Sequence, residues 1–218
     1  MALLELLGGT PEKAIVFTAF RATLESILAA LQARGISATA FHGGMSLKEK
    51  AASLERFERE ARVLVSSEAG SEGRNLQFCN TVVNYDLPWN PQRIEQRIGR
   101  VSRIGQARDV YVFNLAAPQT LEGHLLELLD AKIHMFELVI GEMDMILGNL
   151  SDERDFEEIL MAMWTEAGSG ETFRKRLDEM GETLLEAKRG YLRAKQVDDT
   201  LFGEVGGQGT REATGGTP

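Results

Sequence analysis

The sequence lacks the cysteines of a disulfide framework and the long apolar run of a membrane span. Its one cysteine among 218 residues, Cys79, excludes an internal disulfide and a Cys-x-x-Cys metal site. No stretch approaches the roughly 18 uninterrupted apolar residues that a membrane span requires. The opening MALLELL lacks the basic region and the full apolar core of a signal peptide. Together these absences predict a cytoplasmic protein with no membrane partner.

The charge of the chain is acidic overall but unevenly distributed. A formal net charge of −9 argues against a protein that coats nucleic acid indiscriminately. Residues 92–109 nevertheless carry a local balance of +3, whereas residues 151–200 carry −5. A basic segment inside an acidic protein indicates a local anion site, although a solvated helix face is the simpler alternative.

Short apolar runs alternate with helical patterns through the first half of the chain. We predict strands at 14–18, 37–41, 63–65, 81–85 and 110–115, and helices at about 21–33, 46–60 and from 91 onward. Because the strands are almost continuously apolar, the alternation predicts an α/β fold in which helices cover both faces of a parallel sheet. Such sheets bind ligands at the carboxyl ends of their strands, so the loops there are where chemistry is expected.

A helical pattern replaces this alternation after about residue 117. Apolar residues at helical spacing predict a long helix from Leu121 to Leu147, followed by helices at about 152–166 and 171–195. The last residues are rich in glycine and threonine. We therefore predict an α/β domain over 1–118, a helical extension over 119–202 and a disordered tail over 203–218.

The most informative stretch is QRIGRVSRIGQ, residues 96–106. On a helix, Gln96, Arg100 and Arg103 would share one face, and Gly99 would let a backbone or a phosphate approach closely. Guanidinium groups suit phosphate oxygens, and two of them beside a glutamine could hold a transferring γ-phosphoryl group. A surface helix with salt-bridged arginines is the alternative.

Three further features are weaker. A predicted buried strand runs into a small, polar loop with Gly70 and Gly73, where backbone amides could face a phosphate, although such a loop is usually only a turn. In the turn DLPWNP, Trp89 is more simply a packed side chain than a ligand contact. His42, at a strand end, is more simply a packed or hydrogen-bonded residue than a catalytic one.

These stretches, in this order, resemble the motifs of the second RecA-like lobe of superfamily-two helicase-like ATPases. KAIVFTAF (13–20) resembles motif IV, FHGGM (41–45) the turn after it, SSEAGSEGRNLQ (66–77) motif V and QRIGRVSRIGQ (96–106) motif VI. DLPWNP and the RIGQ ending are similar to the SNF class, and the combination is similar to its RapA-like bacterial branch, which associates with RNA polymerase. One departure is Ser102, where many SNF-class proteins have histidine. The resemblance covers roughly 13–117.

The resemblance implies a role for each matching residue. Arg100 and Arg103 would reach the nucleotide on a partner lobe, with Arg103 as the arginine finger and Gln96 as the γ-phosphate sensor. The motif V residues would bind nucleotide and couple it to nucleic acid, and the residues at two strand ends would contact the nucleic-acid backbone. The motif V residues are Gly70, Glu72, Gly73 and Asn75, and the backbone contacts are Thr18, Phe20, Arg21, Ser66 and Ser67.

Two ATPase motifs are missing. The sequence contains no GxxxxGK[ST] phosphate loop and no DE-x-H box for a metal ion. In the family both lie on the N-terminal RecA-like lobe, so ATP and Mg²⁺ would be held mainly there. We therefore expect a fragment or a split-gene subunit that is inactive alone and joins that lobe to form a double-stranded DNA translocase. An RNA helicase lobe and a non-catalytic interaction module are the alternatives.

Overall fold

The computed structural model describes residues 2–67, 76–102, 108–117, 120–132, 147 and 156–203, and of residues 131–132 and 198–203 it describes the backbone alone. In chain order the elements are α1 (Ala2–Gly8), β1 (Ala14–Thr18), α2 (Arg21–Ala33), β2 (Ala38–Phe41), α3 (Leu47–Arg59), β3 (Val63–Ser67), β4 (Thr81–Asn84), α4 (Pro91–Ile98), β5 (Tyr111–Asn114), α5 (Leu121–Glu127), the π-helical turn η2 (Leu128–Lys132), α7 (Phe156–Ala167) and α8 (Gly170–Gly203).

The five strands form one parallel sheet in the order β2-β3-β1-β4-β5. The three inner strands are buried almost throughout, whereas the edge strands β2 and β5 alternate between more and less buried residues. This difference follows from position, because an inner strand is covered on both faces and along both edges. The predicted α/β fold with a parallel sheet is confirmed.

Two apolar cores lie on opposite faces of the sheet. On one face, Val16 packs with Leu24 and Leu31 of α2 and with Leu7 of α1. On the other face, a cluster around Phe57 of α3 includes Phe17, Phe41 and Val101, besides alternate residues of the inner strands. The period-two pattern of the strands thus feeds both cores, as expected for a doubly covered sheet.

Local signals in the sequence explain where two of the helices begin and end. Ser46 caps α3 in a capping box, because its hydroxyl accepts from the Glu49 amide while the Glu49 carboxylate accepts from the Ser46 amide. The same carboxylate is stabilised by the Ser46 hydroxyl and amide, which lower the pKa of Glu49. Gly35, at a φ of 69°, follows the last turn of α2.

The first helix, α1, is an element that the sequence reading missed. Its side chains Leu3 and Leu7 are buried beside α2, and the guanidinium of Arg62 donates to the carbonyl oxygen of Leu7. The spacing of the two leucines by four residues is a helical signal. α1 has only seven residues, too few for its apolar pattern to stand out in the sequence.

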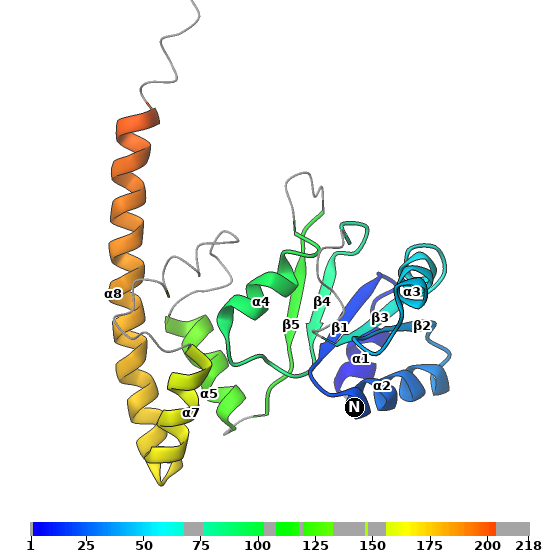
Figure 1. Cartoon of the computed structure of the whole chain (residues 1–218), viewed down its shortest axis with the longest axis horizontal. Coiled ribbons are helices and arrows are strands. Elements are labelled where there is room, and N and C mark those ends of the chain that lie inside the picture. The colour runs from blue at the N-terminus through cyan, green and yellow to red at the C-terminus, as the bar shows by residue number, and fades with distance from the viewer. Residues whose placement is uncertain are drawn as a thin grey trace, which may run out of the picture.

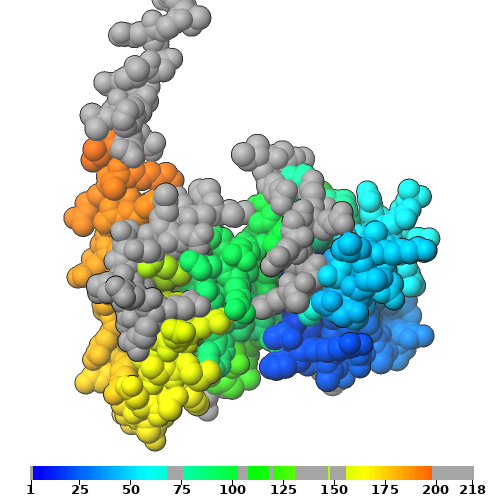
Figure 2. Space-filling model, in the orientation of Figure 1, coloured from blue at the N-terminus to red at the C-terminus, as the bar shows by residue number. Residues whose placement is uncertain are grey.

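The helical part after the sheet has a core of its own. Side chains of α5, α7 and α8 pack together around Leu125, Leu160 and Phe173, and this core also takes in Leu87 and Ile94, which precede and lie on α4. Figure 1 shows α5 and α7 between the long α8 and the sheet. Figure 2 shows α7 and the first part of α8 (yellow) massed beside α4 and α5 (green). The helical extension is confirmed, whereas the predicted boundary at residue 118 stays a prediction.

The predicted long helix and the predicted tail lie only partly within the described residues. The long helix predicted from Leu121 is described as α5 followed by η2, and Leu147 at its predicted end is helical. The predicted tail over 203–218 lies outside the described residues except for Gly203. Within the described part of the chain, no helix combines the length and apolar character needed to cross a bilayer.

Cys79 is fully buried beneath β1 and β4. Its thiol lies 3.0 Å from the carbonyl oxygen of Lys13 and 3.4 Å from that of Thr81, to which it donates. Burial away from water disfavours the thiolate and raises the pKa of Cys79 from 9.0 to about 11. The thiol is thus a packing group held in its neutral form.

This burial predicts a pH dependence of stability. The unfolded chain loses the thiol proton near the ordinary pKa, whereas the folded chain keeps it to about 11, so the contribution is complete below the ordinary value and is lost as pH rises toward 11. Between about pH 7.5 and about pH 10, the urea-derived free energy of unfolding should fall by about 1 kcal/mol more in the native chain than in Cys79→Ala. Parallel pH profiles for the two chains would contradict the buried neutral thiol.

Candidate nucleotide-facing site at the carboxyl edge of the sheet

The carboxyl ends of the strands bring a row of side chains together. In the register of the sheet, Phe41, Ser66, Phe17, Asn84 and Asn114 lie side by side across the five strands. Residues in register share a face of a parallel sheet, here the face covered by α3. The two asparagines therefore sit next to each other at one end of the row, and Asn84 Nδ2 donates to Asn114 Oδ1 at 2.7 Å.

Arg97 of α4 reaches back over this row. Its Nη1 donates to Asn84 Oδ1 at 2.7 Å and to the carbonyl oxygen of Asp86 at 3.1 Å. The guanidinium carbon lies 5.1 Å from the centre of the Phe17 ring, within the range of a cation–π contact. Arg97 is only 4% exposed and Asn84 is fully buried. One buried cation thus ties α4 to β1 and β4, and through Asn114 to β5.

The segment after Arg97 is a turn and not a continuation of the helix. α4 ends at Ile98, and the amides of Arg100 and Val101 donate to the carbonyl oxygens three residues back, those of Arg97 at 3.2 Å and of Ile98 at 3.0 Å. The prediction that a single helical face carries Gln96, Arg100 and Arg103 is therefore wrong for Arg100, which lies beyond the helix end.

The turn that carries Arg100 is nevertheless firmly anchored. The next residue, Val101, is fully buried in the core beneath α3, and the carbonyl oxygen of Arg100 accepts from the Leu76 amide at 3.1 Å. The Arg100 side chain is half-buried, and none of the recorded hydrogen bonds or ion pairs joins it to another described residue. Its guanidinium is therefore available to an anion from outside.

The other motif residues are described only in part. Gln96 is exposed on α4. Arg103 and the predicted motif V residues lie outside the described residues, the latter being Gly70, Glu72, Gly73 and Asn75. The hydrogen bond between Leu76 and Arg100 joins the end of the motif V stretch to the motif VI turn.

Two of the predicted nucleic-acid contacts are buried. The Thr18 hydroxyl donates to Asp86 Oδ2, which also accepts from the Ala19 amide at 3.0 Å. The Ser66 hydroxyl donates to the carbonyl oxygen of Ser67 at 3.1 Å. Both side chains are 0% exposed, so a direct phosphate contact fits them poorly; Ser67 itself is half-buried. Their hydroxyls shape the edge from within.

Phe20 and Arg21, in contrast, lie on the surface. Phe20 is 65% exposed at the start of α2, and Arg21 pairs with Glu25 at 3.0 Å in water-exposed surroundings, where such a pair is weak and easily exchanged. A Cβ on Gly44 would lie 3.2 Å from Arg21 Nη1 and 3.4 Å from His42 Nδ1. Glycine at 44 therefore leaves room for the turn to approach both side chains.

The sequence predicts that Trp89 is a packed side chain and that His42 is packed or hydrogen-bonded. Trp89 packs against the core of the helical part, as predicted. The Nδ1 atom of His42 is buried and makes no hydrogen bond with a described residue. Of the two predicted alternatives, this atom is therefore packed and not hydrogen-bonded.

The described part of this edge offers one cation that suits a phosphate. Arg100 offers a half-buried cation on a rigid turn, which suits phosphate oxygens. Within the described ranges, no three or more histidine, cysteine, aspartate or glutamate side chains come together as a metal site.

Comparison with protein families identifies this lobe. Residues 1–105 match the helicase conserved C-terminal domain. These residues belong to the helicase C-terminal domain family. The matched span contains the whole sheet except β5, together with α4 and the Arg100 turn. The matched span therefore includes Arg97 and its partners Asn84, Asp86 and Phe17.

Two bacterial relatives support this family assignment. Bacillus subtilis YqhH, named an uncharacterized ATP-dependent helicase, is 42% identical over 184 residues, which are 84% of this chain and 33% of YqhH. The Vibrio cholerae RNA polymerase-associated protein RapA is 49% identical over 106 residues, 47% of this chain and 11% of RapA. The predicted resemblance to the C-terminal lobe of SNF-type, RapA-like helicases is confirmed. The chain spans about a third of YqhH and about a ninth of RapA.

Solved structures support the fold of the lobe. The C-terminal part of the Fun30 ATPase domain has a TM-score of 0.54 and 23% identity, covering 58% of this chain and 43% of that one. The Escherichia coli DEAD-box protein SrmB, bound to RraA, has a TM-score of 0.52 and 25% identity, covering 65% and 84%.

The network of this helicase lobe predicts a specific loss of stability. Arg97→Met should lower the free energy of unfolding by about 2–3 kcal/mol, because it leaves the buried Asn84 Oδ1 and the partly buried carbonyl oxygen of Asp86 without their charged donor. Arg97→Lys should lose less, since an ammonium keeps the charge but not the planar contact with Phe17. Urea unfolding of the 218-residue chain measures both.

The matched control is Arg93→Ala on the same helix. Arg93 is 47% exposed and pairs with Glu157 at 3.5 Å, so its loss should cost at most about 1 kcal/mol. Equal effects of Arg97→Met and Arg93→Ala would contradict the role assigned to the buried guanidinium.

Proposed function

We propose that this chain is the C-terminal motor lobe of an ATP-dependent translocase that moves along double-stranded DNA. The observation that carries the proposal is Arg100, a half-buried guanidinium on a turn that is fixed by Val101, Leu76 and the Arg97 network. A preorganised cation is what stabilises charge on a transferring phosphoryl group, because no reorganisation is needed when that charge develops.

ATP and Mg²⁺ would be held mainly by an N-terminal RecA-like lobe. Arg100 and Arg103 would reach the γ-phosphate across the cleft between the lobes, with Arg103 as the finger and Gln96, exposed on α4, as the sensor. Gly70, Glu72, Gly73 and Asn75 would couple this site to nucleic acid. The chain supplies guanidinium groups and their positions, and the partner lobe supplies the nucleotide and the metal ion.

Contacts to nucleic acid would come from the exposed residues at the carboxyl edge. Phe20 and Arg21 protrude at the start of α2, and Ser67 is partly accessible at the end of β3. Thr18 and Ser66 would hold the backbone of these strand ends in place from inside. Contacts of this kind go to phosphates and not to bases, so binding should be largely independent of sequence and sensitive to salt.

The names of the relatives support the ATP-dependent and polymerase-linked parts of the proposal. YqhH is named an ATP-dependent helicase and RapA an RNA polymerase-associated protein. We propose that the assembled motor, of which this chain is one lobe, uses ATP. We propose RNA polymerase as one candidate target of that motor. The helices after residue 118, whose core shares Ile94 with α4, would brace the lobe.

The finger assignment predicts two loss-of-function variants. In the protein formed by joining this chain to its N-terminal lobe, Arg100→Ala and Arg103→Ala should each lower kcat of ATP hydrolysis by about 10³. KM for ATP should change much less, because the guanidinium groups act mainly on charge that develops in the transition state. Steady-state ATPase assays measure both constants.

Arg93→Ala again serves as the control, since Arg93 pairs with Glu157 and lies outside the proposed finger. It should keep kcat within about twofold of the native value. Native turnover in both finger variants would favour the non-catalytic interaction module instead.

The proposal of a double-stranded DNA translocase predicts which nucleic acid stimulates ATP hydrolysis most. At equal phosphate concentration and fixed salt, duplex DNA should raise the ATPase rate of the joined protein more than single-stranded DNA or RNA. The isolated 218-residue chain should show no turnover, because its sequence has no phosphate loop. Strongest stimulation by RNA would replace this proposal with the RNA helicase lobe, and robust hydrolysis by the isolated chain would contradict the division of labour between lobes.

A further inference from the structure

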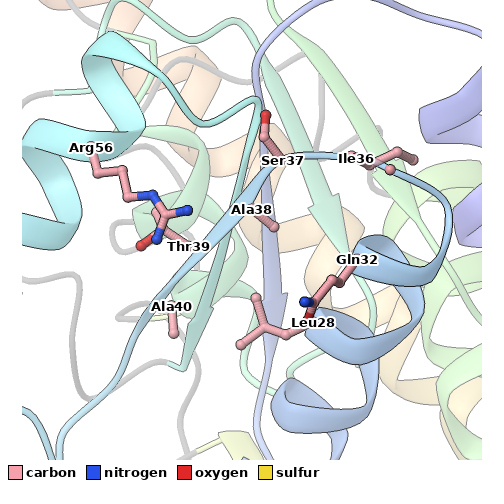
Figure 3. A pocket seen from close by; sticks show the side chains of 9 residues that line it. Leu28, Gln32, Ile36, Ser37, Ala38, Thr39, Ala40 and Arg56 are labelled. Carbon is pink, nitrogen blue, oxygen red and sulfur yellow. The ribbon is translucent and has the colours of Figure 1, made fainter.

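One groove of the molecule lies on the β2 side of the sheet, away from Asn84 and Arg97. A groove of about 570 Å³ runs along the outer edge of β2 and is bounded by α2 on one side and α3 on the other. Figure 3 shows Arg56 reaching from α3 toward β2, with Leu28 and Gln32 of α2 across the strand. β2 is the first strand of the sheet, so no described strand covers this edge.

The register of β2 shows which backbone groups face the groove. The carbonyl oxygen of Ser37 accepts from the Val63 amide, so Ser37 and Thr39 direct their backbone groups toward β3. Alternate residues of a parallel strand bond to opposite sides, and Ala38 and Ala40 therefore direct theirs outward. The Ser53 hydroxyl already donates to the carbonyl oxygen of Ala40. The amides of both alanines and the carbonyl oxygen of Ala38 are left for an added strand.

The two walls of the groove differ in chemistry. The side chains of Ala38, Ala40, Leu28 and Ile36 pack at the margin of the core beneath α2, so this wall continues an apolar core to the surface. The opposite wall carries Arg56, which is the one charged residue among the described residues lining the groove. None of the recorded hydrogen bonds or ion pairs joins its guanidinium to another described residue.

An added strand would have to match both walls. Successive side chains of a strand point to opposite faces of the sheet, so alternate residues would meet the apolar wall and Arg56. We propose that the free edge of β2 binds an extended segment of a partner protein as a sixth strand, with apolar side chains toward α2 and carboxylates toward Arg56. Main-chain hydrogen bonds would give affinity, and the alternation would give specificity.

Charge argues for a different protein over a second copy of this chain. Two copies that paired through β2 would bring the same walls together, each with an uncompensated Arg56 and no carboxylate lining the groove. An acidic segment supplies the missing charge. The inference goes beyond the proposed motor function and does not depend on it.

The test uses the 218-residue chain and two fluorescent eight-residue peptides, one of alternating valine and glutamate and one of alternating valine and lysine. Fluorescence anisotropy should show binding of the glutamate peptide, and about threefold weaker binding of the lysine peptide, since Arg56 is an exposed charge. Ala40→Pro should weaken the glutamate peptide at least about tenfold, because it removes an amide that faces the groove and leaves the ladder to β3 intact.

Arg56→Glu keeps the experiment decisive should Ala40→Pro unfold, because Arg56 is exposed and its replacement leaves the core untouched. This variant should reverse the preference and bind the lysine peptide better. Lys48→Glu makes the same charge change on α3 outside the groove and should leave both affinities within about twofold.

Failure of the glutamate peptide to bind overturns the proposal. So does binding that Arg56→Glu leaves unchanged, or that a folded Ala40→Pro chain retains in full. Self-association of the native chain in sedimentation experiments, abolished by Ala40→Pro, would assign the edge to a second copy and would equally overturn it.

Discussion

A single buried cation fixes the geometry on which the lobe depends. Arg97 gives up its hydration to lie between α4 and the sheet, and this cost is reduced because Asn84 and the carbonyl oxygen of Asp86 accept from its guanidinium and Phe17 lies against it. A buried charge tolerates little displacement, since a small shift would leave it desolvated and without acceptors. Arg97 therefore fixes where α4 lies over the carboxyl ends of the strands. It also fixes where the turn begins, because α4 ends at Ile98, the residue after Arg97.

That turn has a second set of restraints that owe nothing to charge. Val101 fills the core beneath α3, and the Arg100 carbonyl oxygen is held by Leu76. On its other side, α4 contributes Ile94 to the core of the helical part. The Arg100 side chain thus extends from a segment whose backbone is anchored to the sheet, to the end of the motif V stretch at Leu76 and, through α4, to the helices beyond. The backbone that carries this guanidinium is therefore held in place by the lobe itself.

The sequence predicts the sheet well because apolar strand runs depend only on which residues are buried on both faces, and the capping box at Ser46 is equally local. The site is harder. An arginine next to Gln96 on an amphipathic helix is typical of a solvated face, and only the register of β4 brings Asn84 under Arg97. In the same way, the polar residues at a strand end do not reveal which of them point inward, and Thr18 proves to be buried. The resemblance in motif order supplied the family, whereas three-dimensional contacts supplied the positioning residue.

The order of the strands separates the two surfaces of the lobe. The β2 edge lies three strand spacings from β4, about 14 Å at the usual separation of neighbouring strands. A segment added at β2 would therefore extend the sheet away from Arg97 and the Arg100 turn, without covering either. β3 and β1 lie between the two edges and are buried except at Ser67, so this part of the sheet is held by packing on both faces. A partner held at β2 would consequently move with the lobe and would leave the carboxyl edge around Arg97 uncovered.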